Sequence, residues 1–139
     1  MKLVLDTNVV VSGLLWSGAP AQLLDAAFAD EIELFTSRRL LAELARILGR
    51  SKFEKFIAAT GLAIDDLVLG YADLTMIVDP LPIPPTVKAD PDDDHVLACA
   101  AAAKVGLIVS GDIHLRDLKS YGQIPIVTPS EALKYLTSV

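Results

Sequence analysis

The sequence predicts an α/β fold in which helices cover both faces of a mostly parallel sheet. Short, continuous apolar runs of strand length alternate with longer segments of helical spacing, which favours parallel strands joined by helices. The chain has 139 residues and is 53% hydrophobic, enough to cover a sheet on both sides. We find no internal repeat. We therefore expect a single domain spanning residues 1–139.

The chain opens with a strand that is expected to be buried. Residues 2–5 are an apolar run that ends at Asp6, as is typical of a strand covered on both faces. Residues 21–29 then have helical spacing, with Pro20 near the first turn. Residues 32–35 form the next apolar run and predict a second strand.

The middle of the chain predicts three helices and a weaker strand. Ser37 can cap a helix with one apolar stripe, formed by Leu40, Leu41, Leu44, Ile47 and Leu48. Two further helices, over residues 51–60 and 64–72, are separated by Gly61. Residues 75–78 are the weaker strand candidate.

The last part of the chain begins with an extended connector inside the domain, which contains Pro80, Pro82, Pro84 and Pro85. Residues 92–104 predict a helix that is apolar almost all round after an acidic start. Two buried strands are expected at residues 107–109 and 125–127. Thr128 and Pro129 then open a final helix with a capping-box pattern.

Charge is divided between two regions of the sequence. The net charge of −6 and the pI near 4.7 argue against a general nucleic-acid coat protein. However, six of the twelve basic residues lie between positions 38 and 55: Arg38, Arg39, Arg46, Arg50, Lys52 and Lys55. Four acids lie together in another short stretch: Asp90, Asp92, Asp93 and Asp94. An acidic metal-binding pocket beside a basic surface would explain both groups.

Neither the cysteine nor the two histidines predict a disulfide or a zinc site. Cys99 is the single cysteine, lies in an apolar run and is expected to be a small core residue, so a reducing compartment is favoured. His95 and His114 lack the spacing of zinc sites and are expected in loops or on the surface. The sequence has neither a signal-peptide pattern nor an apolar run of membrane-spanning length. We expect a cytoplasmic protein with no membrane contact.

Four acids are candidate ligands of a divalent cation: Asp6, Glu43, Asp94 and Asp112. Asp6 and Asp112 each follow a predicted strand, and ligands of parallel α/β folds bind beyond the carboxyl ends of the strands. Glu43 falls at the edge of its helix's apolar stripe, and Asp94 falls in the first turn of another helix. Mg²⁺ and Mn²⁺ prefer oxygen ligands and can activate water for phosphodiester hydrolysis.

Each of these acids also has a structural explanation. Asp6 can form a local turn after its strand, and Asp112 can be a turn residue. Glu43 can pair with arginines one turn away on the helix surface. Residues 92–94 can complement the dipole of a helix N-terminus, although three successive acids exceed what a cap needs.

The basic strip, which we define as Arg39, Arg46 and Arg50, has spacings of seven and four. This spacing predicts that the three arginines lie on one side of the helix, with Glu43 among them. There they can hold the phosphates of RNA by bidentate contacts that do not read its sequence. The alternative is an exposed salt-bridge network that contributes roughly a few tenths of a kcal/mol per pair.

Four segments resemble, in order, the motifs of the PIN-domain ribonucleases, and especially of the VapC-like toxins of prokaryotic toxin–antitoxin systems: residues 2–9, 41–44, 90–98 and 109–112. The first is an apolar strand followed by Asp-Thr-Asn, and the last is a strand that ends in Ser-Gly-Asp. The motifs cover nearly the whole chain. The proline-rich connector departs from the well-studied toxins.

The resemblance implies a PIN-like three-layer fold and an endoribonuclease, dependent on Mg²⁺ or Mn²⁺, that cuts single-stranded or looped RNA. It also implies a small antitoxin protein as inhibitor and a homodimer. It implies that Asp94 is the third acid of the site, with Asp93 as the alternative one position away. Asn8 and Ser110 would be supporting residues around the metal.

Three other functions fit parts of the pattern. A haloacid-dehalogenase-like phosphatase also uses an Asp after the first strand, but needs a second acid where this chain has Asn8, and an amide cannot protonate a leaving group. A receiver domain would need a Lys at the end of the last strand, which residues 126–128 do not provide. The third alternative is an inactive PIN fold that binds protein or RNA.

Overall fold

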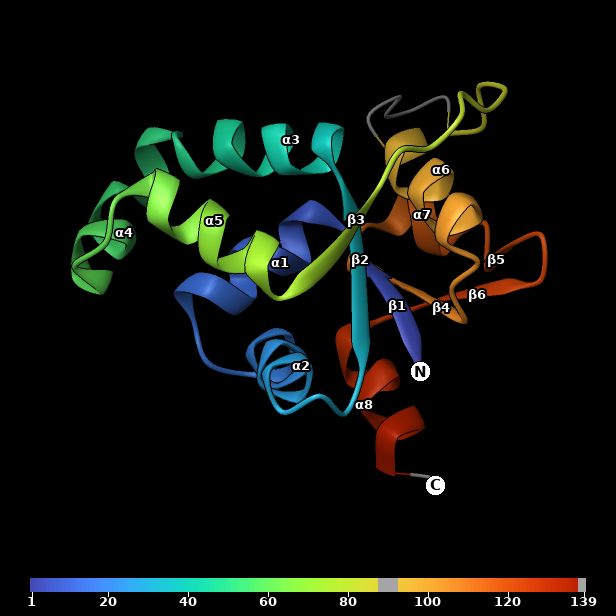
Figure 1. Cartoon of the computed structure of the whole chain (residues 1–139), viewed down its shortest axis with the longest axis horizontal. Coiled ribbons are helices and arrows are strands. Elements are labelled where there is room, and N and C mark those ends of the chain that lie inside the picture. The colour runs from blue at the N-terminus through green and yellow to red at the C-terminus, as the bar shows by residue number, and fades with distance from the viewer. Residues whose placement is uncertain (88–92, 138–139) are drawn as a thin grey trace.

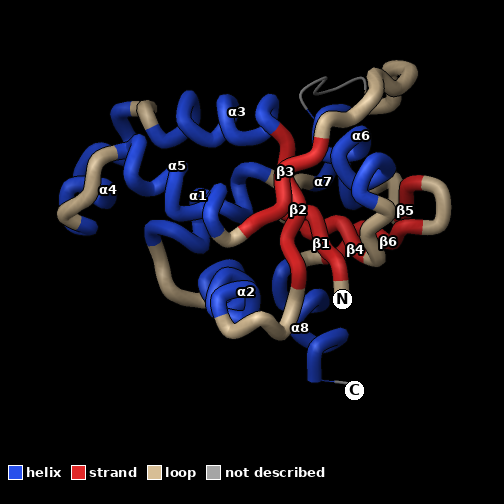
Figure 2. The backbone as a smooth tube through the Cα atoms, viewed as in Figure 1, coloured by secondary structure: helices blue, strands red, loops and turns tan. Residues whose placement is uncertain are grey.

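The computed structural model describes residues 1–87 and 93–137. Its centre is a six-stranded sheet in the order β3-β2-β1-β4-β6-β5, drawn in red in Figure 2. The strands are β1 (Lys2–Leu5), β2 (Glu33–Ser37), β3 (Thr75–Val78), β4 (Leu107–Val109), β5 (Ser120–Tyr121) and β6 (Ile124–Val127). All neighbouring pairs are parallel except β5 with β6. The predicted α/β class with a mostly parallel sheet is therefore confirmed.

Helices cover both faces of this sheet, which gives three layers (Figure 1). On one side lie α1 (Thr7–Leu15), α2 (Ala19–Phe28), α3 (Arg38–Leu48), α5 (Ile64–Asp73) and α8 (Pro129–Thr137). The other face carries α6 (Asp93–Ala103) and α7 (Ile113–Arg116). The short η1 (Ser51–Phe53) and α4 (Glu54–Thr60) link α3 to α5.

The central strands have no solvent face, which explains their continuous apolar sequences. In β1, Leu3 and Leu5 belong to the core under α1 and α2, whereas Val4 belongs to the core under α6. The same alternation in β4 places Leu107 on the first side and Ile108 on the second. Apart from Lys2, the exposed first residue of β1, every side chain of these two strands is buried, so the sequence does not show the alternation of a half-exposed strand.

Two predicted helix caps are confirmed. The Leu40 backbone N–H donates to Ser37 Oγ at 3.2 Å and so starts α3 directly after β2. At the start of α8, the Glu131 N–H donates to Thr128 Oγ1 at 3.1 Å, and the Thr128 N–H donates to Glu131 Oε1 at 3.3 Å. This reciprocal pair is a capping box.

The sequence did not predict three of the elements: α1, α7 and β5. The sequence of α1, TNVVVSGLL, is rich in valine, which disfavours a helix by local propensity. Its valines at positions 9–11 are nevertheless all buried, and α1 packs against α2 and α3. Tertiary packing therefore overrides propensity here.

In the described part of the chain, no helix is long and apolar enough to span a membrane.

Candidate active site

Asp6 and Ser110 occupy equivalent places at the carboxyl ends of the neighbouring strands β1 and β4. Both are buried, with Asp6 only 3% exposed. The Ser110 hydroxyl donates to Asp6 Oδ2 at 2.8 Å and accepts from the Asp112 backbone N–H at 2.9 Å. Ser110 thus fixes the Asp6 carboxylate and ties it to the turn that carries Asp112.

Asp112 lies at the start of α7, where its Oδ1 accepts the His114 backbone N–H at 2.7 Å. It is partly exposed and close enough to Asp6 for their charges to interact. Burial raises the pKa of Asp6, the Ser110 hydrogen bond opposes that rise, and the Asp112 charge adds to it. The structure therefore holds two carboxylates together, one of them unfavourably buried when ionised.

This burial predicts an unusual pH dependence of stability in the presence of chelator. Because the pKa of Asp6 is higher in the folded than in the unfolded protein, the folded state binds this proton more tightly. The contribution of Asp6 to the free energy of unfolding should be greatest below the ordinary Asp pKa and should fall as pH rises through the raised one. We expect Asp6→Asn to melt at a higher temperature than wild type at neutral pH.

Asp25→Asn is the matched control for this measurement, because Asp25 is an exposed acid on α2. Its melting temperature should follow that of wild type at every pH. An Asp6→Asn protein that is less stable than wild type at pH 7, with its spectrum unchanged, would mean that ionised Asp6 stabilises the metal-free fold.

Glu43 lies on α3 beside two arginines of the basic strip. One hollow of about 240 Å³ is lined by Arg39, Ala42, Glu43 and Arg46 of α3 and by His95 of α6. Glu43 is partly buried, and Arg39 and Arg46 are exposed. The structure thus places Glu43 among these arginines, as the helical spacing predicted, and brings α6 against the same hollow.

Arg50 corrects the predicted extent of the basic strip. The helix α3 ends at Leu48 with Gly49 as its C-cap, and the chain is extended at Arg50, where φ is −70° and ψ is 140°. Two residues four positions apart, such as Arg46 and Arg50, lie on the same face only if both belong to the helix. Arg50 therefore does not share a helix face with Arg46, and it does not line the hollow around Glu43.

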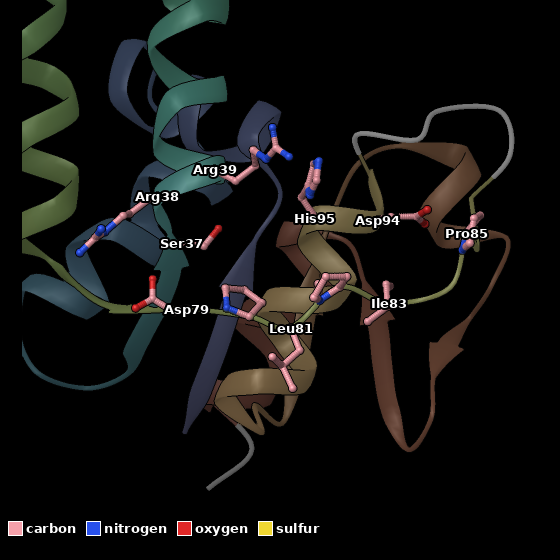
Figure 3. A pocket seen from close by; sticks show the side chains of 12 residues that line it. Ser37, Arg38, Arg39, Asp79, Leu81, Ile83, Pro85, Asp94 and His95 are labelled. Carbon is pink, nitrogen blue, oxygen red and sulfur yellow. The ribbon is translucent and has the colours of Figure 1, made fainter.

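Asp94 and Asp93 have different surroundings at the start of α6. The Asp94 carboxylate accepts the backbone N–H of Thr86 at 3.1 and 3.2 Å and that of Val87 at 2.8 Å. It therefore fastens the end of the connector to the helix, and it points toward Pro85 (Figure 3). Asp93 is buried, with 5% exposure, whereas Asp94 is partly exposed. Asp90 and Asp92 lie outside the described residues.

The two histidines differ as well. His114 is exposed on α7. His95 was expected in a loop or on the surface, but it is a half-buried residue in the first turn of α6 and lines the hollow beside Glu43. The sequence did contain a signal for this position, because His95 directly follows the acidic run at the start of a helix that was predicted to be buried.

The acids form no ready-made metal cage. Among residues 1–87 and 93–137, no group of three or more His, Cys, Asp and Glu side chains is arranged to hold a metal ion. Asp6 and Asp112 nevertheless form a pair of interacting carboxylates that is joined through Ser110. Such a pair suits Mg²⁺, which keeps several waters and is often held by one or two carboxylates. A cation would also relieve the repulsion between them.

Comparison with known proteins places this geometry in a family. A family model described as the PIN domain matches residues 2–114, a range that includes all four candidate acids. The chain belongs to the PIN domain family. An uncharacterized protein of Methanocaldococcus jannaschii is 28% identical over 143 residues, which cover 96% of this chain and 90% of that protein.

One solved structure resembles this PIN domain in fold, and a second matches it with a lower score. VapBC2 from Rickettsia felis, bound to a DNA fragment from its promoter, has a TM-score of 0.58 at 16% identity, covering 91% of this chain and 97% of that chain. FitAcB from Neisseria gonorrhoeae has a TM-score of 0.49 at 18% identity, covering 92% and 98%. At such identities, the likeness to VapBC2 concerns the fold alone.

Membership of the PIN family also removes the phosphatase and receiver alternatives.

A larger pocket of about 490 Å³ adjoins the arginines of this PIN domain. We call it the connector pocket, because the proline-rich connector forms one of its walls (Figure 3). It is lined by Ser37, Arg38, Arg39, Asp79, Pro80, Leu81, Pro82, Ile83, Pro85, Asp94, His95 and Ala98. Arg39 and His95 also line the hollow beside Glu43, so the two spaces share a border.

Proposed function

We propose that this PIN domain is a metal-dependent endoribonuclease that hydrolyses phosphodiester bonds of single-stranded RNA. The observation that carries the proposal is the buried Asp6 carboxylate, held by Ser110 beside Asp112 at the carboxyl edge of the sheet. Family membership supports nuclease chemistry in general. The direct test is cleavage of single-stranded RNA by the purified protein with Mg²⁺, with Mn²⁺ or with chelator.

In this proposal a bound Mg²⁺ or Mn²⁺ supplies an activated water and stabilises negative charge on the phosphoryl oxygens. Asp6 and Asp112 bind the cation, and Ser110 orients Asp6 through its hydrogen bond. Asn8, which follows Asp6 on the first turn of α1 and is exposed, supports the same site. Glu43 is the proposed acid from α3, and it lies in the hollow that His95 of α6 also lines.

For the third acid we propose Asp93 in place of Asp94. The Asp94 carboxylate is engaged by the backbone of the connector, and its role there is structural. Asp93 is buried at the N-terminus of α6, which packs against β1 and β4, the two strands that end at Asp6 and Ser110. Asp93 is therefore buried on the helix that packs against these two strands, whereas Asp94 is occupied by the connector, and this makes Asp93 the better candidate ligand.

Cation binding should stabilise the protein in a measurable way. If Mg²⁺ or Mn²⁺ binds only the native state, a hundredfold excess over its dissociation constant raises the free energy of unfolding by about 2.7 kcal/mol. We expect a matching rise in melting temperature that is reversed by chelator and absent in Asp6→Asn. A melting temperature insensitive to both cations in the wild type would contradict the proposed site.

We infer further that the protein is the toxin of a toxin–antitoxin pair, that a small antitoxin inhibits it and that it forms a homodimer. The motif resemblance to VapC-like toxins supports this inference, and the fold likeness to VapBC2 is consistent with it. Expression of the wild type in a bacterial host should then arrest growth, whereas expression of Asp6→Asn should not. Light scattering of the purified protein reports its oligomeric state.

The arginines beside Glu43 are proposed to hold RNA phosphates. Arg46→Ala should weaken binding to single-stranded RNA of any sequence and reduce the slope of log affinity against log salt by roughly 0.7. Arg50→Ala is the matched control, because Arg50 lies beyond the end of α3. If Arg46→Ala keeps the wild-type affinity and salt slope, Arg46 belongs to a surface salt-bridge network instead.

A further inference from the structure

The connector pocket is large enough for one nucleotide base and has the wall composition of a ligand site. Its volume of about 490 Å³ lies within the range of small-molecule sites, roughly 300–1,000 Å³. One wall is apolar and consists of the connector residues from Pro80 to Ile83 together with Ala98 of α6. Charged and polar groups, among them Arg39 and His95, lie along the rest of its lining.

The apolar wall is held in place at both ends. At one end the connector continues from β3, which pairs with β2 along the sheet edge. At the other end the Asp94 carboxylate binds the N–H groups of Thr86 and Val87, and Val87 itself is buried. Proline further restricts the backbone between these anchors. The pocket is therefore largely preformed, which reduces the entropy lost when a ligand enters.

The side of the pocket nearest Glu43 is basic. Arg39 and His95 lie next to each other there (Figure 3), and both also border the hollow that contains Glu43 and Arg46. A ligand that fills both spaces must combine an apolar, flat part with an anionic part. Nucleotides within an RNA strand have this composition, with a base that stacks and a phosphate that binds arginine.

We propose that the connector pocket binds one unpaired base of the RNA substrate, with the adjoining phosphate at Arg39. The inference rests on the proposed ribonuclease function and adds a substrate-positioning site to it. A base can enter the pocket only when it is turned out of a helix, so the pocket selects single-stranded or looped RNA. Leu81, which is 81% exposed, supplies apolar surface for the base, and His95 supplies a ring for stacking.

The test measures the coupling between the pocket and a single base of the RNA. A short fluorescent RNA is prepared with an abasic nucleotide at each position in turn, and its affinity is measured by anisotropy in chelator, which prevents metal-dependent cleavage. In wild type, we expect one position at which loss of the base weakens binding about tenfold, as for a stacked base. In Leu81→Ala and in His95→Ala, the same loss should change affinity by less than about twofold.

Leu69→Ala is the matched control, since Leu69 is also an exposed leucine but lies on α5, away from the pocket lining. It should respond to the abasic RNAs as wild type does. An equal abasic effect in wild type and in both pocket variants overturns the inference. Cleavage by wild type alongside that result leaves the ribonuclease proposal standing. If the abasic effect is lost in the pocket variants but the wild type does not cleave RNA, the base pocket is supported and the ribonuclease proposal is contradicted.

Discussion

Replacement of Asp6 by Asn is expected to reduce RNA cleavage about a thousandfold or more, which corresponds to about 4 kcal/mol in the activation free energy. Asn keeps the shape of the side chain and can still accept the Ser110 hydrogen bond, but it removes the negative charge. A cation held by fewer charges binds more weakly and contributes less stabilisation to the transition state. Single-turnover cleavage of a labelled RNA measures the effect directly.

Three controls make this result interpretable. Asp25→Asn should cleave at the wild-type rate, because Asp25 is exposed on α2. The Asp6→Asn protein should keep its circular dichroism spectrum and, without metal, should be more stable than wild type at neutral pH. It should also bind RNA in chelator about as well as wild type does. Cleavage by Asp6→Asn at the wild-type rate would show that Asp6 has no part in the reaction.

The second large effect separates the neighbouring acids Asp93 and Asp94. We expect Asp93→Asn to lose RNA cleavage by about a hundredfold or more, since it removes a buried charge from the proposed metal site. Asp94→Asn should retain cleavage within several-fold of wild type. It should instead lower the free energy of unfolding by roughly 1–3 kcal/mol, because an amide has one acceptor oxygen for the N–H groups of Thr86 and Val87.

Cleavage rates and denaturant unfolding of the two variants provide the comparison. Rates are measured at saturating Mg²⁺ or Mn²⁺, so that a loss of metal affinity is distinguished from a loss of turnover. The opposite pattern, an inactive but stable Asp94→Asn beside an active Asp93→Asn, would restore Asp94 as the ligand. It would then require the connector to release Asp94 when the cation binds.

The fold could be predicted from the sequence to a large extent because its strands are buried on both faces. The apolar runs at residues 2–5 and 107–109 are too short and too uniform for amphipathic helices, and both are strands. The caps at Ser37 and Thr128 were equally local signals and are confirmed. The sequence did not predict α1, whose helical state depends on packing against α2 and α3.

The candidate site was predictable in part, for a related reason. Asp6 and Asp112 follow buried parallel strands, and the carboxyl ends of such strands meet at one edge of the sheet. Spacing within a helix also placed Arg39 and Arg46 beside Glu43. It failed for Arg50, because the helix ends two residues earlier.

The sequence alone predicted the family and the mostly parallel sheet, and it supplied the candidate acids, since these depend on local patterns and on the order of motifs along the chain. Only the tertiary structure decided what the acids contact. Ser110 and Asp6 are 104 residues apart in sequence, and their hydrogen bond exists because β1 and β4 pair. Asp94 and Asp93 are neighbours in sequence, yet one binds the connector and the other is buried, because successive residues of a helix point about 100° apart.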